Sequence, residues 1–238
     1  MNPGSRTENI TPAAVVAVVE TCASGIFDLL RGASEEFVRE LQTRPAPRVA
    51  EAIHQLELAC RGRLAGPGPL TGMGFVGAPE QDLSEALRLI WWIKQGKEIR
   101  VKKHVLNPAS DSYYDYNTSE WFGTTRATGR PFISAPYVDS WGTDQLTITA
   151  AVPLAVHGVF IGVVAADLDP ALYLKPIEKL LLRSENLTLV DAEDRVILSS
   201  NPVLTSGVSL ERYLQRTGIE PLRRETSSST NWQAVELP

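Results

Sequence analysis

Residues 144–167, DQLTITAAVPLAVHGVFIGVVAAD, decide the fold of this chain. Apolar and polar residues alternate from Asp144 to Leu154, which is the period-2 pattern of a half-buried strand. Residues 159–166 are apolar in both phases, as expected of a central strand that is covered on both faces. The connector 155–158, AVHG, is short enough to join the two strands as an antiparallel hairpin.

Asp167 ends the second of these strands and has no evident structural role. A helix is expected directly after it, but Asp169 and Pro170 form the better N-cap and first-turn pair for that helix.

Aromatic and acidic residues precede the hairpin at the points where further elements are expected to begin and end. They are Tyr114, Asp115, Trp121, Tyr137 and Asp139. Carboxylates beside aromatic faces suit an organic cation, because a charge-assisted hydrogen bond contributes roughly 1.5–3 kcal/mol and a cation–π contact about 0.5–2 kcal/mol. In the alternative interpretation, Trp121 and Tyr137 are core aromatics and Asp139 closes a turn. Asp115 is either a third anion in the site or a helix-start residue.

A second hairpin is expected upstream, with strands at residues 87–94 and 97–105. Trp91 alternates with other apolar residues on one face of the first strand, which predicts a core position. Trp92 points to the other face and is predicted to form the floor of the ligand site. Before this hairpin, residues 71–77 are expected to form a strand whose glycines allow close backbone approach.

The order of these motifs resembles the ligand-binding core of Cache sensor domains. The motifs are WF at 121–122, ATGRPFISAPYVD at 127–139, a strand with alternating polar residues, and GVFIGVVAAD at 158–167. Cache domains are PAS-like extracytoplasmic sensors of bacterial chemoreceptors and histidine kinases. The resemblance implies an α+β fold, in which an antiparallel sheet with long N-terminal helices and flanking helices binds a small molecule under covering loops.

The resemblance also implies roles for individual residues. Tyr137 and Asp139 in the PYVD motif, together with Asp167, match residues that hold the ligand's amino group in amino-acid-binding members. Tyr114 matches a further pocket aromatic. The arginine that holds the ligand carboxylate in those members is replaced by Ser119. The site therefore keeps the residues that bind a ligand's ammonium group and lacks the arginine that binds its carboxylate. This combination implies a sensor for an organic amine or a related cationic metabolite.

Other functions remain open at this stage. Arg126 or Arg130 would restore a carboxylate clamp, in which case the ligand is an amino acid or a carboxylate. Asp115, Asp139 and Asp167 would in principle support acid–base catalysis. The sequence has no nucleophile elbow, His–carboxylate pair or metal-ligand spacing, so we expect no enzyme, no metal and no cofactor. A dimerisation scaffold without a ligand is the third alternative.

The chain is expected to divide into three parts. Residues 1–65 form an N-terminal helical region, residues 66–200 a Cache-like ligand-binding domain, and residues 201–238 a C-terminal helix and a flexible tail marked by TSSST at 226–230. The apolar stripe of the N-terminal helices suits either packing within one chain or a homodimer. Both interpretations remain open.

The charge and the hydropathy of the chain limit which partners and which cellular location are expected. A net charge of −5 and a pI near 5.3 argue against a nucleic-acid partner, because duplex binding needs a concentrated basic surface. The longest N-terminal apolar run, residues 13–19, is far shorter than the ~20 residues that span a bilayer, and Glu8 and Glu20 flank it. The sequence therefore predicts no membrane span, a cytoplasmic bacterial sensor, and signalling through an unidentified downstream protein.

Overall fold

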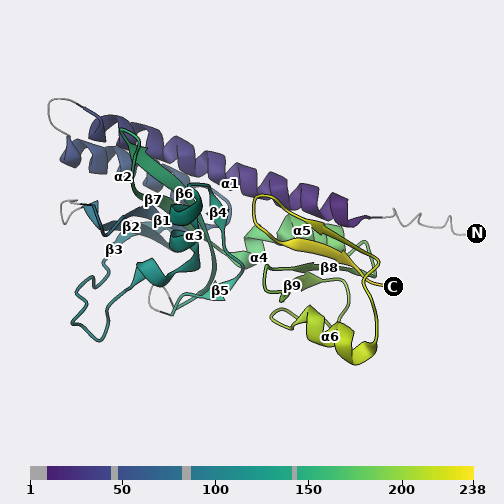
Figure 1. The fold of residues 1–238 in the computed structure, drawn as a ribbon. Helices are drawn as coiled ribbons and strands as arrows, with labels where there is room; N and C mark the ends of the chain where they lie inside the picture. The colour runs from purple at the N-terminus through teal and green to yellow at the C-terminus, as the bar shows by residue number, and fades with distance from the viewer. Residues whose placement is uncertain (1–9, 44–47, 82–86, 141–143) are drawn as a thin grey trace, which may run out of the picture. The chain divides into compact units, whose positions relative to one another are not determined.

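The computed structural model describes residues 10–43, 48–81, 87–140 and 144–238 (Figure 1). They form two compact units. The larger unit holds the described part of residues 25–173. The smaller unit holds the described part of residues 1–24 together with residues 174–238. Each unit combines helices with an antiparallel sheet, so the predicted α+β class is confirmed.

Two helices lie in the described part of residues 1–65, where an N-terminal helical region is predicted. They are α1 (Pro12–Leu41) and α2 (Val49–Ala65). In α2, Ala52, Leu56, Cys60 and Leu64 recur every four residues and are all buried, which makes one continuous apolar face. In the larger unit, Arg63 Nε of α2 donates to the carbonyl oxygen of Leu29 in α1 (3.1 Å).

The larger unit is built on a seven-stranded antiparallel sheet with the order β3-β2-β1-β7-β6-β4, and β5 also pairs with β6. The strands are β1 (Leu70–Gly77), β2 (Leu89–Gln95), β3 (Glu98–Lys102), β4 (Phe132–Ile133), β5 (Tyr137–Val138), β6 (Leu146–Val156) and β7 (Val159–Leu168). The short helices are the 3-10 helix η2 (Tyr116–Thr118), α3 (Glu120–Thr128) and α4 (Pro170–Tyr173).

The hairpin that decides the fold is present as predicted. Val156 of β6 pairs with Val159 of β7, so only His157 and Gly158 form the turn. Both have positive φ, at 52° and 80°, which is the conformation that a tight two-residue hairpin turn requires. β7 lies between β6 and β1, and its residues from Ile161 onward are buried.

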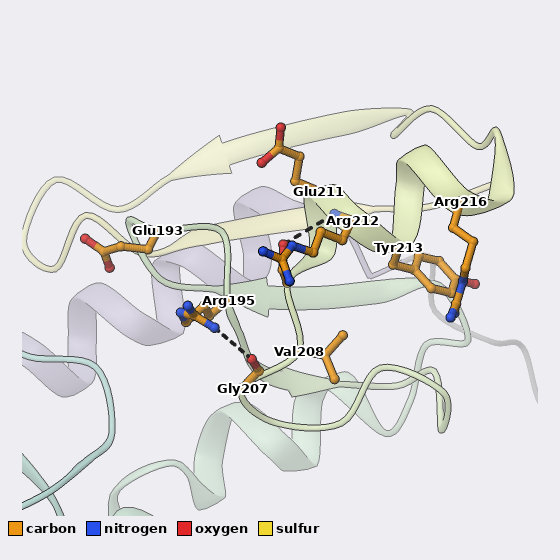
Figure 2. A pocket seen from close by; sticks show the side chains of 9 residues that line it. Glu193, Arg195, Gly207, Val208, Glu211, Arg212, Tyr213 and Arg216 are labelled. Atoms are coloured by element: carbon orange, nitrogen blue, oxygen red, sulfur yellow. Dashed lines mark hydrogen bonds between the residues drawn. The ribbon is translucent and has the colours of Figure 1, made fainter.

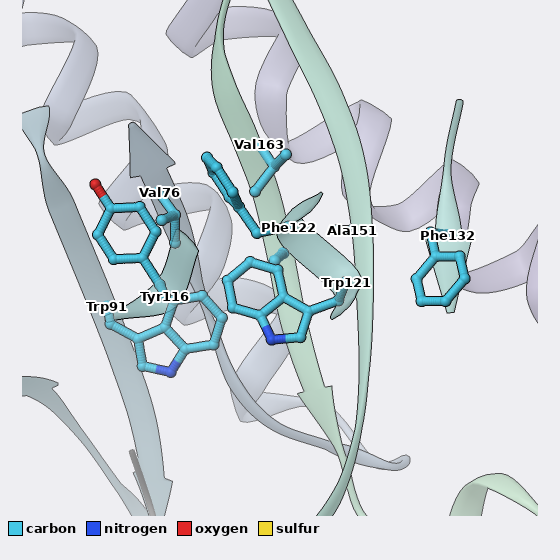
Figure 3. Close-up of a cluster of buried hydrophobic side chains, with 9 residues drawn as sticks. Val76, Trp91, Tyr116, Trp121, Phe122, Phe132, Ala151 and Val163 are labelled. Atoms are coloured by element: carbon cyan, nitrogen blue, oxygen red, sulfur yellow. The ribbon is translucent and has the colours of Figure 1, made fainter. Parts of the chain in front are cut away.

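The two faces of this sheet have different partners. Phe37 of α1 and Phe75 of β1 contact each other with their ring centroids 4.9 Å apart, so α1 covers this face. Met73 shares that face with Phe75, and Trp92 of β2 pairs with Met73, so Trp92 also lies on the helix-covered face. Trp91 lies on the opposite face in a cluster of buried aromatic side chains (Figure 3). Trp91 is buried, so its predicted core position is confirmed, and only the predicted placement of Trp92 is wrong, because residue alternation alone does not say which face the helices cover.

Glycines in β1 allow the close approach that their pattern predicts. A Cβ atom on Gly74 would lie 1.9 Å from the carbonyl oxygen of Ile90 and 2.8 Å from the indole of Trp91. The Trp91 side chain therefore lies directly over the backbone of β1, in space that any larger residue would occupy.

The smaller unit has its own four-stranded sheet, with the order β10-β11-β8-β9. Its strands are β8 (Leu187–Val190), β9 (Val196–Ser199), β10 (Arg223–Thr226) and β11 (Gln233–Glu236), and its later helices are α5 (Lys175–Leu181) and α6 (Leu210–Thr217). The flexible tail expected from TSSST is wrong, since the run joins β10 to β11. Trp232 beside it is 1% exposed. The division of the chain at residues 65 and 200 stays a prediction.

Hydrogen bonds explain why this serine-rich segment is ordered. The carboxylate of Glu20 accepts from Ser227 Oγ (2.9 Å), from Ser228 N (2.7 Å) and from both the N–H and the hydroxyl of Ser229. Burial acts to raise the pKa of Glu20, but the serine hydrogen bonds outweigh it and lower that pKa. Serine hydroxyls satisfy local polar groups in this way, so a polar run does not by itself indicate disorder.

We expect Gly74→Ala to lower the free energy of unfolding by at least about 2 kcal/mol, because the added methyl group forces β1 and β2 apart. The matched control is Gly123→Ala in α3, where a Cβ atom meets nothing within 4 Å. The control should raise stability by up to about 1 kcal/mol, since glycine is a poor helix former. Urea unfolding of both variants measures the difference. Equal effects in the two variants would contradict the close approach of β1 and β2.

Candidate ligand-binding site

A closed cavity lies on the sheet face opposite α1 and α2 in the larger unit. Its volume is about 10 Å³, which is room for about one water molecule. The residues that line it are Val76, Leu89, Trp91, His104, Tyr114, Trp121, Asp139 and Asp167. They come from β1, β2, β7, α3 and the segments between the strands. The cavity therefore combines aromatic walls with two acidic side chains.

Asp167 is held at the centre of the sheet. It lies on β7 between Gly72 of β1 and Thr149 of β6. Thr149 Oγ1 donates to Asp167 Oδ1 (2.8 Å), and the hydroxyl groups of Tyr137 and Thr149 are also 2.8 Å apart. When Asp167 is ionised, Thr149 donates to it and Tyr137 donates to Thr149, because each hydroxyl has one proton. Tyr137 thus orients the acid through Thr149.

Burial raises the pKa of Asp167 to about 7. The hydrogen bond from Thr149 acts to lower this pKa, and the nearby charge of Asp139 raises it further. An acid in this state gains from a positive ligand, because a cation stabilises the ionised form that burial disfavours. The electrostatics of the empty cavity therefore favour a cationic ligand.

The position of the Trp91 indole in the cavity wall depends on Gly72. A Cβ atom on Gly72 would lie 2.7 Å from Trp91 Nε1 and 3.2 Å from Asp167 Oδ2, so glycine leaves room for both side chains. Trp121 contributes a second indole from α3 (Figure 3). Its Nε1 is buried and has no hydrogen-bond partner of ordinary geometry among the described residues, although it lies near enough to Tyr137 to act on that hydroxyl's pKa. A ligand acceptor group would satisfy this nitrogen.

The structure places four predicted site residues around the cavity and three elsewhere. Tyr114, Trp121, Asp139 and Asp167 line it. Tyr137 acts through Thr149, as described above. Asp115 Oδ1 accepts from the backbone N–H of Asn117 (3.2 Å), which is the helix-start role. Trp92 lies on the other face, so its predicted place as the floor is wrong. The three acids proposed for catalysis are therefore not all gathered in the cavity.

Sequence reasoning missed three residues. Trp91 lines the cavity, and the signal that could have found it is the pair of glycines opposite it in β1. His104 stacks on Tyr114 with ring centroids 4.8 Å apart, and its isolated position in the sequence gave no signal. Thr149 was treated as one polar residue of an alternating strand, and only its register with Asp167 shows its role.

The two arginines considered as a carboxylate clamp lie away from the cavity. Arg126 Nη2 forms an ion pair with Glu80 (3.0 Å), and Arg130 is exposed. Neither lines the cavity. Among the residues that the structure describes, no group of three or more His, Cys, Asp or Glu side chains is arranged to hold a metal ion.

An open groove adjoins the closed cavity. It has a volume of about 580 Å³ and is lined by Arg88, His104, Val105, Leu106 and Asn107. His104 lines both spaces, and it stacks on Tyr114 at the cavity wall. Burial and then the charge of Lys102 lower the pKa of His104 to about 4, so its imidazole is neutral at pH 7. Among the described residues that line the groove, Arg88 is the charged one.

Comparisons with known proteins identify the type of domain. Residues 82–171 match the sequence family "Methyl-accepting chemotaxis protein-like, first PDC sensor domain". No curated protein matches the chain. The solved structure "Methyl-accepting Chemotaxis protein X" is 17% identical with a TM-score of 0.62, and the match covers 95% of this chain and 94% of that one.

Two further solved structures are ligand-binding domains of chemoreceptors. The ligand-binding domain of the Pseudomonas aeruginosa PAO1 amino acid chemoreceptor PctC, in complex with GABA, is 15% identical with a TM-score of 0.59, covering 95% and 96% of the two chains. The ligand-binding domain of Pseudomonas fluorescens chemoreceptor CtaA, in complex with L-serine, is 16% identical with a TM-score of 0.56, covering 95% and 92%. The Cache-type sensor assignment and its fold are confirmed, and the matched family is a sensor family rather than an enzyme class.

The predicted cytoplasmic location is wrong. The matched family is that of chemoreceptor sensor domains, and one similar structure is the "extracellular domain of the putative histidine kinase soHK1S-Z6" (14% identity, TM-score 0.54). α1 is also long and apolar enough to cross a membrane, with a mean hydropathy of 1.8, although buried core helices and signal sequences pass the same test. Counting only the uninterrupted run at 13–19 missed this, because Glu20 interrupts a longer apolar segment.

The raised pKa of Asp167 predicts a pH-dependent effect of Asp167→Asn on stability. Folding takes up a proton at Asp167 between its ordinary pKa of 3.8 and about 7, so this group's contribution to stability falls as the pH rises through that range. Asparagine removes that penalty. We expect the melting temperature of the variant, relative to the parent chain, to rise by at least about 4 °C between pH 5 and pH 8.

The comparison of variant with parent separates Asp167 from His104. The lowered pKa of His104 makes its own contribution to stability rise with pH between about 4 and 6.5, which is the opposite direction, but both proteins contain it. Differential scanning calorimetry at several pH values measures the difference. A difference that stays constant from pH 5 to pH 8 would show that Asp167 titrates normally.

Proposed function

We propose that this chain is the ligand-binding part of a sensor that recognises an organic amine or a related cationic metabolite. The observation that carries the proposal is the lining of the closed cavity. Asp139 and Asp167 face the same space as Trp91, Trp121 and Tyr114, and no lysine or arginine among the described residues lines it. Small-molecule sites usually join an apolar wall to a few polar groups that fix orientation, and this lining has that character.

The energetics suit an ammonium group. A hydrogen bond from the ligand to an ionised carboxylate contributes roughly 1.5–3 kcal/mol, and a cation over an indole or phenol ring adds about 0.5–2 kcal/mol. Asp139, Asp167 and the aromatic walls supply both kinds of interaction. Together with burial of the ligand's apolar part they support affinity near 1 μM, which corresponds to about −8 kcal/mol.

The size of the cavity implies that binding moves the protein. A space of about 10 Å³ admits no organic ligand, so side chains must move before an amine enters. Three of the lining residues, His104, Tyr114 and Asp139, lie outside the strands and helices, where movement costs least. A ligand that binds the open form shifts the population toward it. We propose that this shift is the signal, and that it passes to a downstream protein or to a second copy of the chain.

A second candidate ligand is a zwitterion, and Arg88 is the observation that favours it. Arg88 lines the groove next to the cavity, and His104, which stacks on Tyr114, lines both spaces. An amino acid whose carboxylate reaches this groove would bind Arg88 while its ammonium group binds the acids. Three similar structures are described as complexes with GABA, L-serine and L-arginine.

We expect a thermal-shift screen to give a rise in melting temperature with organic amines. Asp139→Asn and Asp167→Asn should each weaken the calorimetric affinity for the best amine by about 30-fold, because each loses a charged partner worth on the order of 2 kcal/mol. The matched control is Asp115→Asn, which removes an acid that lies outside the cavity and should leave affinity unchanged.

Other outcomes of the same screen discriminate the alternatives. Preference for amino acids over the matching amines, lost in Arg88→Gln, would replace the amine with the zwitterion. Consumption of the ligand would indicate an enzyme. No rise in melting temperature with any amine, amino acid or carboxylate would overturn the proposal and favour a scaffold without a ligand.

We also expect amine affinity to depend on pH through Asp167. The bound ammonium group requires the ionised carboxylate, so affinity should fall about tenfold per pH unit below about pH 7 and level off above it. Calorimetry between pH 5.5 and pH 8.5, with an amine that stays protonated throughout, measures the profile. Asp167→Asn should flatten it. A parent profile that is already flat would rule out the direct pairing of Asp167 with the ammonium group.

A further inference from the structure

A second cavity, in the smaller unit, has a different chemistry. Its volume is about 510 Å³, within the ~300–1,000 Å³ of typical ligand sites. It is lined by Glu193, Arg195, Gly207, Val208, Ser209, Glu211, Arg212, Tyr213 and Arg216 (Figure 2). None of these residues belongs to the amine site, and the cavity is open where the amine site is closed.

Three arginines from two separate chain segments meet at this cavity. Arg195 lies in the turn between β8 and β9, and its Nη1 donates to the carbonyl oxygen of Gly207 (3.3 Å). Arg212 and Arg216 lie one turn apart on the same face of α6. Like charges at this spacing destabilise a helix by about 0.2–0.5 kcal/mol. The arrangement is therefore unfavourable without an anion.

Among the described residues, these arginines differ from several others in forming no ion pair with a carboxylate. Arg61 and Arg224, for example, form ion pairs of 2.7 Å with Glu57 and Asp194. In the part of the chain that the structure describes, Arg212 and Arg216 form no ion pair with a carboxylate. An ordinary solvated helix face on a chain of net charge −5 would pair them with nearby acids.

The two glutamates at the cavity do not neutralise the arginines. Glu211 Oε1 accepts from Gln215 Nε2 (3.1 Å), within α6. In Figure 2 the carboxylates of Glu193 and Glu211 point away from the guanidinium group of Arg212. The guanidinium groups are thus left facing the open space.

The start of α6 adds to the positive potential. Ser209 caps the helix, and its Oγ accepts from the backbone N–H of Arg212 (3.3 Å). The first turn of the helix lines the cavity, so the positive end of the helix dipole lies there with the three guanidinium groups. The phenol of Tyr213 provides a further hydrogen-bond donor at the same wall.

We propose that this cavity binds a small polyanion that carries phosphate groups or several carboxylates. The planar fork of a guanidinium group matches the oxygen atoms of both anions, often with two parallel hydrogen bonds. Arg195 and Arg212 approach such an anion from the two chain segments, and Arg216 extends the site along α6. The chain would then respond to an anion independently of the amine.

The test is calorimetric titration of the full chain with pyrophosphate and with citrate, using sodium chloride of matched ionic strength as the reference. We expect saturable binding of at least one of the two, weakened about tenfold or more by Arg212→Gln and by Arg195→Gln. The matched control is Arg223→Gln, which removes an exposed arginine of the same unit that lies outside the cavity. It should leave the affinity unchanged.

The titration results distinguish a phosphate site, a carboxylate site and general charge attraction. Binding of pyrophosphate alone identifies a phosphate site, and binding of citrate alone a carboxylate site. Heat that does not saturate, or an equal loss in Arg223→Gln, means that only general charge attraction acts, and overturns the proposal. Asp167→Asn, which should weaken amine binding about 30-fold, must leave anion binding intact, so failure at one site is distinguishable from failure at the other.

Discussion

The structure depends on a carboxyl group that is buried within its central sheet. Asp167 occupies a place where only Gly72 on the next strand leaves room for it and for Trp91, and burial raises its pKa to about 7. Burying an acid without a positive partner is costly. The sheet register nevertheless places Asp167 between Thr149 and Gly72. Thr149 hydrogen-bonds to Asp167, and Tyr137 hydrogen-bonds to Thr149. A cation bound there would relieve this cost.

The two candidate sites differ in the sign of their charged side chains and in how far those side chains are exposed to water. The acidic cavity is small and lined by buried acidic and aromatic side chains, so polar interactions in it are strong. The arginine cavity of the smaller unit is open to water, so its interactions are weaker and more sensitive to salt. The first arrangement favours a conformational response to the ligand, and the second favours rapid exchange.

The sequence predicted the strongly patterned elements and failed where tertiary context decides. Alternation and the AVHG turn predicted the hairpin β6–β7, and the unused Asp167 pointed to the cavity. Which of Trp91 and Trp92 faces the ligand depends on the side that the helices cover, which periodicity does not contain. The ordered TSSST segment depends on Glu20, some two hundred residues away in the chain, and no local pattern reveals that contact. The groove residue Arg88 was missed for the same reason.

The most direct test of amine binding at this site is a carbon-13 NMR titration. It measures the pKa of the Asp167 carboxyl group in the presence and absence of the best amine from a screen. We expect a value near 7 in the free protein and a lower value when the amine is bound, with a fall that matches the roughly 30-fold effect of Asp167→Asn on affinity, because the ammonium group then stabilises the carboxylate. A value near 4 in the free protein, or a value near 7 that the bound amine leaves unchanged, would contradict it.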